Sequence, residues 1–346
     1  MAIVINGSGT VTGLAVGGLP DGTVDAGTLA TDSVTEAKIA TDSVTTTKIP
    51  AALENTFVSG RKNLFINGGF DVWQRGTSLA GATSYLADRW YNSTTETQTR
   101  QTFTVGQTDV PHNPTYYHRG SSGSTEWYGL KQKVENVAIT AGREVTLSYW
   151  AKGSSAFTNA PYRGQNFGSG GSSEVNAALS TASITTSWAR YTHTFTLPSI
   201  SGKTVGAGNY MQISIMRANV NNITIDLANC QLEFGDTATD FEQRSYGEEL
   251  ALCQRYYQAV EGAGAFEFDG LYASGGGNGL GINFPLPVEM RASPTLTHSW
   301  NDTNNIASQS ITASSKGLFV GGTTSGGGRT AMNKTGSGYV RLNAEL

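Results

Sequence analysis

Charged residues are scarce in this chain. They make up 14% of its 346 residues, whereas roughly 25% is typical of globular domains. Glycine, by contrast, occurs 43 times, and long periodic runs of Ala, Glu, Lys and Leu, which are typical of helices, are missing. The composition therefore predicts an all-β, turn-rich molecule with one short helix.

The chain also lacks a basic field and a long apolar run. Its formal net charge is -4, and proteins that bind a polyphosphate backbone carry basic patches instead. The first residues, MAIVINGSGTVTG, have no positively charged start followed by an apolar core. No segment approaches the ~18 apolar residues of a membrane span. We expect no nucleic-acid partner, no membrane insertion and no secretory signal.

Signatures of catalysis are absent as well. The sequence has no GxSxG, HExxH or P-loop motif, and its four histidines lack metal-ligand spacing. Asp236, Asp240, Glu242, Glu248 and Glu249 lie close together in the sequence and are interpreted as a solvated segment leading into a helix. We predict no enzyme, no catalytic residue and no organic cofactor. A carboxylate pair formed across strands, as in glycosidases, stays open as an alternative.

Cysteine is nearly absent. Cys230 and Cys253 are the only two, and they fall in a predicted strand and a predicted helix. Buried thiols are the ordinary interpretation of such positions, and a structural disulfide is not expected in a reducing cytosol.

A decapeptide repeat occupies part of residues 1–59. The units are GTVDAGTLAT, DSVTEAKIAT and DSVTTTKIPA, and each offers two apolar side chains spaced by five. A unit of this size cannot bury an apolar face alone, so it must stack on neighbours or on other chains. A disordered linker rich in Thr, Ser and Asp is one interpretation. The other is a homotrimeric shaft whose chains meet along Val24, Leu29, Val34, Ile39, Val44 and Ile49, with the first residues attached to a larger assembly.

Residues 60–244 alternate short β-branched or aromatic runs with loops of Gly, Ser, Asn and Thr. In 145–150, Val145, Leu147 and Tyr149 alternate with Thr146, Ser148 and Trp150. Such alternation indicates strands with one face in a core. The pattern predicts a β-sandwich of the jelly-roll kind. Its strands are expected at 64–66, 102–105, 130–134, 145–150, 191–197, 210–216 and 223–232.

A connector helix is predicted at 245–258. Ser245 followed by Glu248 has the spacing of a capping box. Residues 259–346 return to strands with frequent glycine, and they are interpreted as a small β domain at the distal end of the molecule.

Several blocks, taken together and in order, resemble the jelly-roll domain of phage tail fibre and tail-associated receptor-binding proteins, which is itself similar to a carbohydrate-binding module. The blocks are NLFINGGFDVWQRG (63–76) with ADRW (87–90), LKQKVEN (130–136), VTLSYWAKGS (145–154), SWARYTHTF (187–195) and the long block at 225–257. The repeats resemble phage fibre shafts, and FPLPVEMRASPTLT (284–297) resembles the closing domain of the same phage proteins.

This resemblance implies a structural virion protein of the phage tail, assembled in the host cytoplasm. Such a protein would contact other phage tail or head proteins through its N-terminus and attach to a host surface glycan or protein. Two alternatives remain: a capsid spike or fibre adaptor with a purely structural role, and a depolymerase of surface polysaccharide.

Sugar recognition relies on aromatic faces, so tryptophans and tyrosines are the candidate ligand contacts. Trp73, Trp90, Trp150 and Trp188 lie inside the family-like blocks and are expected in the core. The aromatic residues in polar loops are the candidates for ligand binding: Tyr116, Tyr117, Trp127, Tyr128, Tyr162, Tyr272 and Trp300.

The resemblance also implies a possible metal site. Carbohydrate-binding modules of this shape often hold a structural Ca²⁺ between the first and last strands, where Asp71, Asp226 and Glu233 would fall. Hard oxygen ligands suit that ion, although a helix cap or an Arg partner explains each carboxylate equally well.

Overall fold

The computed structural model describes residues 4–5, 11–12, 61–122, 126–261, 268–273, 279–299, 303–304, 306–332 and 339–346. The chain divides into two compact units, Met1–Pro50 and Ala51–Leu346. In the first unit, β1 (Val4–Ile5) pairs antiparallel with β2 (Val11–Thr12). The six apolar repeat positions predicted to meet between chains lie outside the described residues, so the trimeric shaft stays a prediction.

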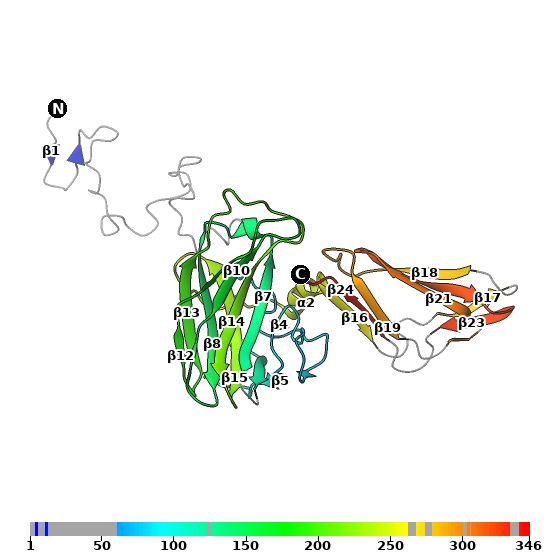
Figure 1. Cartoon of the computed structure of the whole chain (residues 1–346), viewed down its shortest axis with the longest axis horizontal. Coiled ribbons are helices and arrows are strands. Elements are labelled where there is room, and N and C mark those ends of the chain that lie inside the picture. Colours follow the sequence, from blue (N-terminus) through cyan, green and yellow to red (C-terminus); the bar gives the residue numbers. More distant parts are fainter. Residues whose placement is uncertain are drawn as a thin grey trace. The chain divides into compact units, whose positions relative to one another are not determined.

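The second unit begins with a β-sandwich, as the alternating pattern predicted (Figure 1). Its two main sheets have the strand orders β11-β10-β14-β7-β4 and β13-β8-β15-β6-β5-β3, and every pairing within them is antiparallel. The strands of the sandwich are β3 (Ser78–Leu79), β4 (Tyr91–Asn92), β5 (Thr97–Thr102), β6 (Tyr116–Ser121), β7 (Glu126–Glu135), β8 (Glu144–Gly153), β9 (Phe157–Asn159), β10 (Tyr162–Asn166), β11 (Val175–Ala178), β12 (Ala182–Ile184), β13 (Ala189–Thr196), β14 (Tyr210–Val220) and β15 (Thr224–Phe234). The short strands β9 and β12 pair separately, and a 3-10 helix spans Val137–Ile139.

The core lies between the two main sheets. Val145, Leu147 and Tyr149 of β8 are fully buried, as are Met211 and Ile213 of β14. Each large apolar side chain buried in this way contributes roughly 1.5–3 kcal/mol relative to an exposed one. The buried Tyr149 hydroxyl contacts Nε2 of His193 at 3.2 Å and accepts a hydrogen bond from Asn159 at 3.0 Å, so this polar group of the core is paired.

The segment after Asn63 is not the predicted strand. Residues 64–66 form no ladder; instead, the side-chain amide of Gln132 bonds both the N–H and the carbonyl of Ile66 at 2.8 Å. A side chain thus takes the place of a neighbouring strand in satisfying the backbone. The prediction of a strand here was therefore wrong, although Phe65 enters the core.

Asn67 fixes the turn that follows. Its φ of 58° is left-handed, a region that Asn adopts more readily than most residues. Its side chain accepts from the N–H of Val72 at 3.0 Å and donates to the carbonyls of Val72 at 2.9 Å and Asp88 at 3.0 Å. The backbone carbonyl of Asn67 accepts from the indole of Trp90 at 2.8 Å. One buried amide therefore joins the NGG turn to the 88–90 triplet.

Helix α2 (Tyr246–Gln254) begins after Ser245, whose side chain accepts from the N–H of Glu248 at 3.3 Å. The predicted N-cap is confirmed. The helix ends at Gln254, earlier than the predicted residue 258, and Tyr257 already belongs to β16. No helix in the described part of the chain is both long and apolar enough to cross a membrane.

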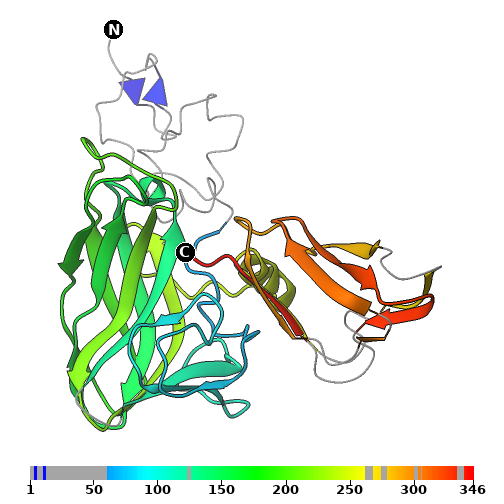
Figure 2. The same cartoon turned by 45° about the vertical axis from the view of Figure 1, so that its right-hand side comes forward.

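The strands after α2 form three small antiparallel sheets, with the orders β16-β24-β19, β17-β23-β20 and β18-β22-β21. A second core of Met290, Leu318, Val320, Val340 and Leu342 lies among them. The end of the chain lies beside α2 (Figure 2), where Ala344 N–H donates to the carbonyl of Tyr256 at 2.8 Å. The strands are β16 (Tyr257–Glu261), β17 (Phe268–Ala273), β18 (Gly279–Pro285), β19 (Thr295–Ser299), β20 (Thr303–Asn304), β21 (Ile306–Ala313), β22 (Gly317–Thr324), β23 (Gly328–Met332) and β24 (Tyr339–Asn343).

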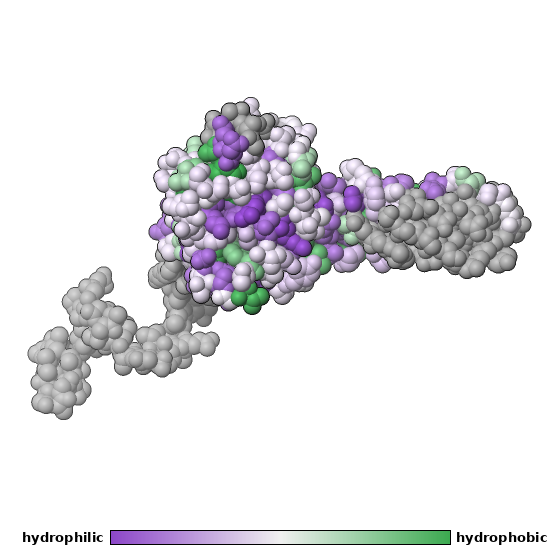
Figure 3. Space-filling model, turned by 90° about the horizontal axis from the view of Figure 1, so that it is seen from below, coloured by the Kyte–Doolittle hydropathy of each residue, from purple (hydrophilic) through white to green (hydrophobic). Residues whose placement is uncertain are grey.

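One face of the molecule is shown by hydropathy in Figure 3. Most of its coloured surface is pale and so of intermediate hydropathy, while strongly hydrophilic and hydrophobic residues form smaller separate patches. A surface of this kind matches a sequence that is low in charge and rich in hydroxyl and amide groups.

Candidate functional site

The outer face of the five-stranded sheet carries a row of four side chains from neighbouring strands. Tyr91 of β4 is opposite Lys131 of β7, Lys131 is opposite Ser214 of β14, and Ser214 is opposite Tyr162 of β10. Residues directly opposite one another in a sheet point to the same side. The next residue of β14, Ile213, is buried in the core. The row therefore points away from the core, with a tyrosine at each end.

A second row runs beside the first. It consists of Lys133, Gln212, Gly164 and Asn176 on β7, β14, β10 and β11. Gly164 lets neighbouring side chains approach closely, because a Cβ on it would lie 2.4 Å from the Asn176 side-chain oxygen and 3.2 Å from Cγ of Gln212. The missing side chain allows amide groups to come together at the middle of the face.

Cations lie over the rings of this face. Nζ of Lys131 is 5.2 Å from the centroid of Tyr91, and Nζ of Lys133 is 4.4 Å from the centroid of Tyr210. Burial, together with the neighbouring Lys131, lowers the pKa of Lys133 to about 8. Burial likewise lowers the pKa of Lys131. The sheet thus holds ammonium groups against aromatic rings, and that of Lys133 also donates to the backbone carbonyl of Leu346.

A hollow of about 300 Å³ opens on the same sheet, and Tyr162, Gln212, Ser214 and Arg217 are among its lining residues. The Arg217 guanidinium lies 4.8 Å from the Tyr162 ring centroid. Hydroxyl, amide and guanidinium groups beside an aromatic ring provide both donors and acceptors for hydroxyl groups, along with an apolar surface for C–H groups. This combination suits a polyhydroxylated ligand.

The predicted aromatic candidates do not share one site. Tyr162 is on the face just described, whereas Tyr116 and Tyr117 belong to β6 of the other sheet. Tyr117 packs with Phe103 and Trp188, at ring-centroid distances of 4.6 and 5.5 Å. All three tyrosines lie in strands and not in the expected loops. The prediction failed because glycine and polar residues interrupt the apolar alternation of these short strands.

For four further candidates the structure does not describe the side-chain position. Trp127 and Tyr128 belong to β7 and Tyr272 to β17, again in strands where loops were expected, and the positions of their side chains lie outside the described structure. Trp300 lies outside the described residues altogether. Their predicted role in ligand contact stays a prediction.

Of the four tryptophans expected in the core, Trp90 is fully buried and Trp73 packs against the core. Trp150 and Trp188 are only half-buried and do not belong to the core cluster. Trp188 packs instead on the outer side of the six-stranded sheet, with Nζ of Lys152 at 5.2 Å from its ring centroid.

The carboxylates predicted to share a calcium ion have separate surroundings. Asp226 is paired with Arg119 through two bonds of 2.6 and 2.8 Å. Glu233 accepts from the N–H of Thr239 at 3.0 Å, and Asp71 lines a pocket elsewhere. Among the described residues, no group of three or more His, Cys, Asp or Glu side chains could hold a metal ion. Asp71, Asp226 and Glu233 therefore do not form the expected ligand set.

The residues that sequence reasoning missed are Tyr91, Tyr210, Lys131, Lys133 and Gln212. The block at 130–136 already contained a signal, since Lys131, Lys133 and Glu135 alternate with apolar and amide side chains. The pairing of that strand with Tyr91 and Tyr210 could not be inferred without the sheet order.

Comparisons with known proteins gave a family match over part of the chain. The family model described as a carbohydrate binding domain matches residues 62–206, which is less than half of the chain. A search of curated proteins found no match.

Solved structures give distant likenesses. The CBM22-2 xylan-binding domain from Paenibacillus barcinonensis is 15% identical, with a TM-score of 0.32 over 42% of this chain and 91% of that one. The N-terminal cellulose-binding domain from a Cellulomonas fimi β-1,4-glucanase is 19% identical, with a TM-score of 0.28 over 49% and 95%. The enzymatically active domain of bacteriophage CBA120 tailspike protein 4 is 15% identical, with a TM-score of 0.31 over 50% and 21%.

The fold and the family match define a β-sandwich protein. Part of its sandwich is similar to carbohydrate binding domains.

Proposed function

We propose that this protein binds glycans through the outer face of the five-stranded sheet. The observation that carries the proposal is the row of Tyr91, Lys131, Ser214 and Tyr162, with Gln212 and Gly164 beside it. Aromatic rings can pack on the C–H face of a pyranose, while the amide and ammonium groups bond its hydroxyls. The match of residues 62–206 to a carbohydrate binding domain supports this role.

The biological setting that we propose is a phage virion, in which the protein is a tail fibre or tail-associated protein attaching to the host surface. The sequence blocks that resemble phage tail proteins and the decapeptide repeats support this setting. A homotrimer would present several weak glycan sites together, and such multivalency raises avidity without any new contact. Other phage structural proteins would bind the N-terminal segment.

Glycan binding can be tested with the full-length protein on an array of bacterial surface glycans. Tyr162→Ala and Gln212→Ala should each lower the affinity for any bound glycan by about tenfold, since each removes one direct contact. Tyr117→Ala is the matched control, because it removes a half-buried tyrosine from the other sheet. If Tyr117→Ala abolishes binding while the two sheet-face variants retain it, the ligand site has been assigned to the wrong sheet.

The alternative classes have their own measurements. Labelled protein that decorates host cells supports receptor binding, whereas failure to decorate them, together with a requirement for particle assembly, would indicate a structural adaptor or capsid spike. Release of reducing ends from host polysaccharide would indicate a depolymerase.

A further inference from the structure

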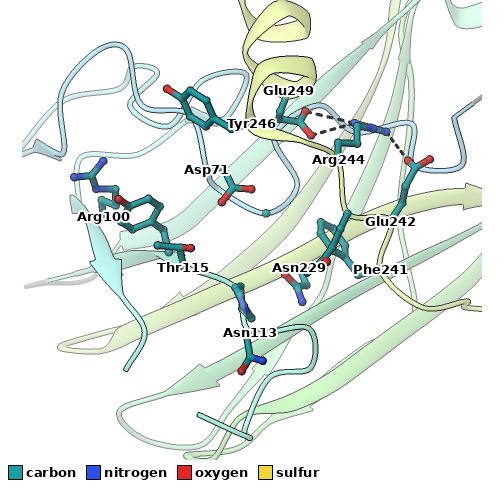
Figure 4. Close-up of a pocket in the computed structure, with 14 residues that line it drawn as sticks. Asp71, Arg100, Asn113, Thr115, Asn229, Phe241, Glu242, Arg244, Tyr246 and Glu249 are labelled. Atoms are coloured by element: carbon teal, nitrogen blue, oxygen red, sulfur yellow. Dashed lines mark hydrogen bonds and ion pairs between the residues drawn. The ribbon is translucent and has the colours of Figure 1, made fainter. Parts of the chain in front are cut away.

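A second cavity, distinct from the sheet face, lies where the NGG turn, β5, the 113–116 segment, β15 and the start of α2 meet. Its volume is about 580 Å³. Figure 4 shows Asp71 projecting among the labelled side chains, with Glu249 and Tyr246 of α2 on one side and Asn113 on the opposite side. The residues come from five separate parts of the sequence, so the cavity exists only in the folded chain.

The backbone around this cavity is held in an unusual conformation. Phe70, which precedes Asp71, has a φ of 58°, and the lining residues Asn113 and Asn229 both have a φ of 46°. Left-handed conformations of residues other than glycine cost of order 1–3 kcal/mol and tend to cluster at functional sites. Asn229 takes this conformation where the register of β15 shifts against β8, between Ala228 and Gln231. Three backbone segments thus turn through left-handed residues around a single cavity.

Asp71 stands in this cavity without a partner. Its carboxylate makes no hydrogen bond or ion pair with the part of the chain that the structure describes, although most of the side chain is shielded from water. Burial and the nearby charge of Glu249 raise its pKa to about 6, so it is ionised at neutral pH. Gly69 makes room for it, because a Cβ on Gly69 would lie 2.7 Å from Oδ2 of Asp71.

The guanidinium of Arg244, beside these carboxylates, is already paired. Arg244 donates to Glu242 at 2.7 Å, to Glu249 at 3.4 Å and to the carbonyl of Phe65 at 3.1 Å. Two carboxylates thus share one guanidinium, and the charge of Asp71 is left over. Arg100, on another wall, lies 4.4 Å from the Tyr116 ring centroid. The excess negative charge at the inner wall favours a ligand with a positive group.

The remaining walls indicate what carries that positive group. Tyr116, Phe241 and Tyr246 supply aromatic surface, and Asn113 and Asn229 supply amides. We propose that this cavity binds an amino sugar with a free ammonium group, which pairs with Asp71 while the pyranose ring packs on the aromatic walls. The site does not depend on the sheet face, so either one can exist without the other.

The test compares three tetrasaccharides with the same β-1,4 linkage that differ only at C2: oligomers of glucosamine, N-acetylglucosamine and glucose. Titration calorimetry of the full-length protein at neutral pH and low salt should show the glucosamine oligomer binding about tenfold more tightly than the other two. Asp71→Asn should remove this preference. Gly69→Ala should remove it as well, because it keeps the charge but displaces the carboxylate.

Two controls make the result specific. Asp236→Asn removes an exposed carboxylate and should leave the preference unchanged, which separates the site from general attraction between a cationic oligomer and an acidic protein. Tyr162→Ala should also leave it unchanged, so failure at the sheet face and failure at this cavity are told apart. Equal binding of the three oligomers, or equal effects of Asp71→Asn and Asp236→Asn, would overturn the proposal. So would a thermal shift with CaCl₂ that is lost in Asp71→Asn, if no preference among the oligomers is found.

Discussion

Arg89 and Glu345 form an ion pair across 256 positions of the sequence, and their side chains are 1% and 5% exposed. Arg75 joins them, with Nη2 at 3.0 Å from Glu345 and Nη1 at 2.5 Å from Asp88. The Arg89 guanidinium also lies 3.5 Å from the centroid of the Tyr256 ring. Glu345, the last residue but one, is thus bound to the 88–90 triplet, which precedes β4 of the five-stranded sheet.

Glu345→Gln should destabilise the protein markedly. Removing one member of a buried ion pair leaves the other charge uncompensated, which typically costs about 3–5 kcal/mol. Urea unfolding of the two proteins measures the difference. Glu289→Gln is the control, because its partner Lys316 is 3.7 Å away and both side chains are largely exposed, where such pairs contribute about 0–1 kcal/mol. Equal effects of the two substitutions would show that the Arg89 pair is not buried in solution.

His118 should make the stability depend on pH. It is fully buried, and its side chain contacts that of Gln98 at 2.9 Å. Burial lowers its pKa from 6.5 to about 3 in the folded state. Below pH 6.5 the unfolded chain therefore takes up a proton that the folded chain does not, and stability falls as the pH falls toward 3.

The corresponding experiment compares the unfolding free energies of wild type and His118→Gln across this range. From pH 6.5 to about pH 5 the wild type should lose about 1.6 kcal/mol more than the variant, because the unfolded histidine passes from half to nearly full protonation over this range. His298→Gln, at an exposed position, should keep the wild-type slope. Parallel curves for wild type and His118→Gln would mean that His118 is protonated in the folded state.

Asn67→Ala should cost about 3 kcal/mol or more. The substitution leaves the N–H of Val72 and the carbonyl of Asp88 without the buried amide that pairs them, whereas the carbonyl of Val72 keeps the N–H of Asp88. Each unsatisfied group costs about 1–3 kcal/mol. Asn222→Ala is the control, because Asn222 is exposed and has a φ of 51°. This variant loses only the tolerance of asparagine for a left-handed backbone conformation, which is worth about 1–2 kcal/mol of stability. Thermal unfolding would contradict the argument if the two variants melted together.

The shaft prediction rests on Val34 and Ile39 of the repeat. Val34→Asp with Ile39→Asp should convert a trimer of the full-length protein into monomers, since charged groups cannot be buried unpaired between chains. Thr46→Asp, at a polar position of the repeat, should leave the assembly intact. Analytical ultracentrifugation measures both, and a monomeric wild type would remove the basis of the proposal.

The alternation of apolar and polar residues predicted the sandwich strands correctly, because it depends only on one face of each strand being buried in a core. Val145, Leu147 and Tyr149 are buried as the period of two predicted. The same reasoning failed at 64–66, where Gln132, distant in the sequence, satisfies the backbone of Ile66. It also placed Tyr116, Tyr117 and Tyr162 in loops, because glycine and polar neighbours hide short strands from a pattern of apolar residues.

The sequence by itself determined the all-β class, the N-cap at Ser245 and the buried face of 145–149, since each depends on neighbours along the chain or on a local period. Only the tertiary structure decided which side chains share a surface. Tyr91 and Tyr162 lie on one row because three strand pairings connect them. The Asp71 carboxylate has no partner among the described residues, while Arg244 in the same cavity is paired with Glu242 and Glu249. Strand order and competition for a partner are properties of the whole fold, so no local pattern contains them.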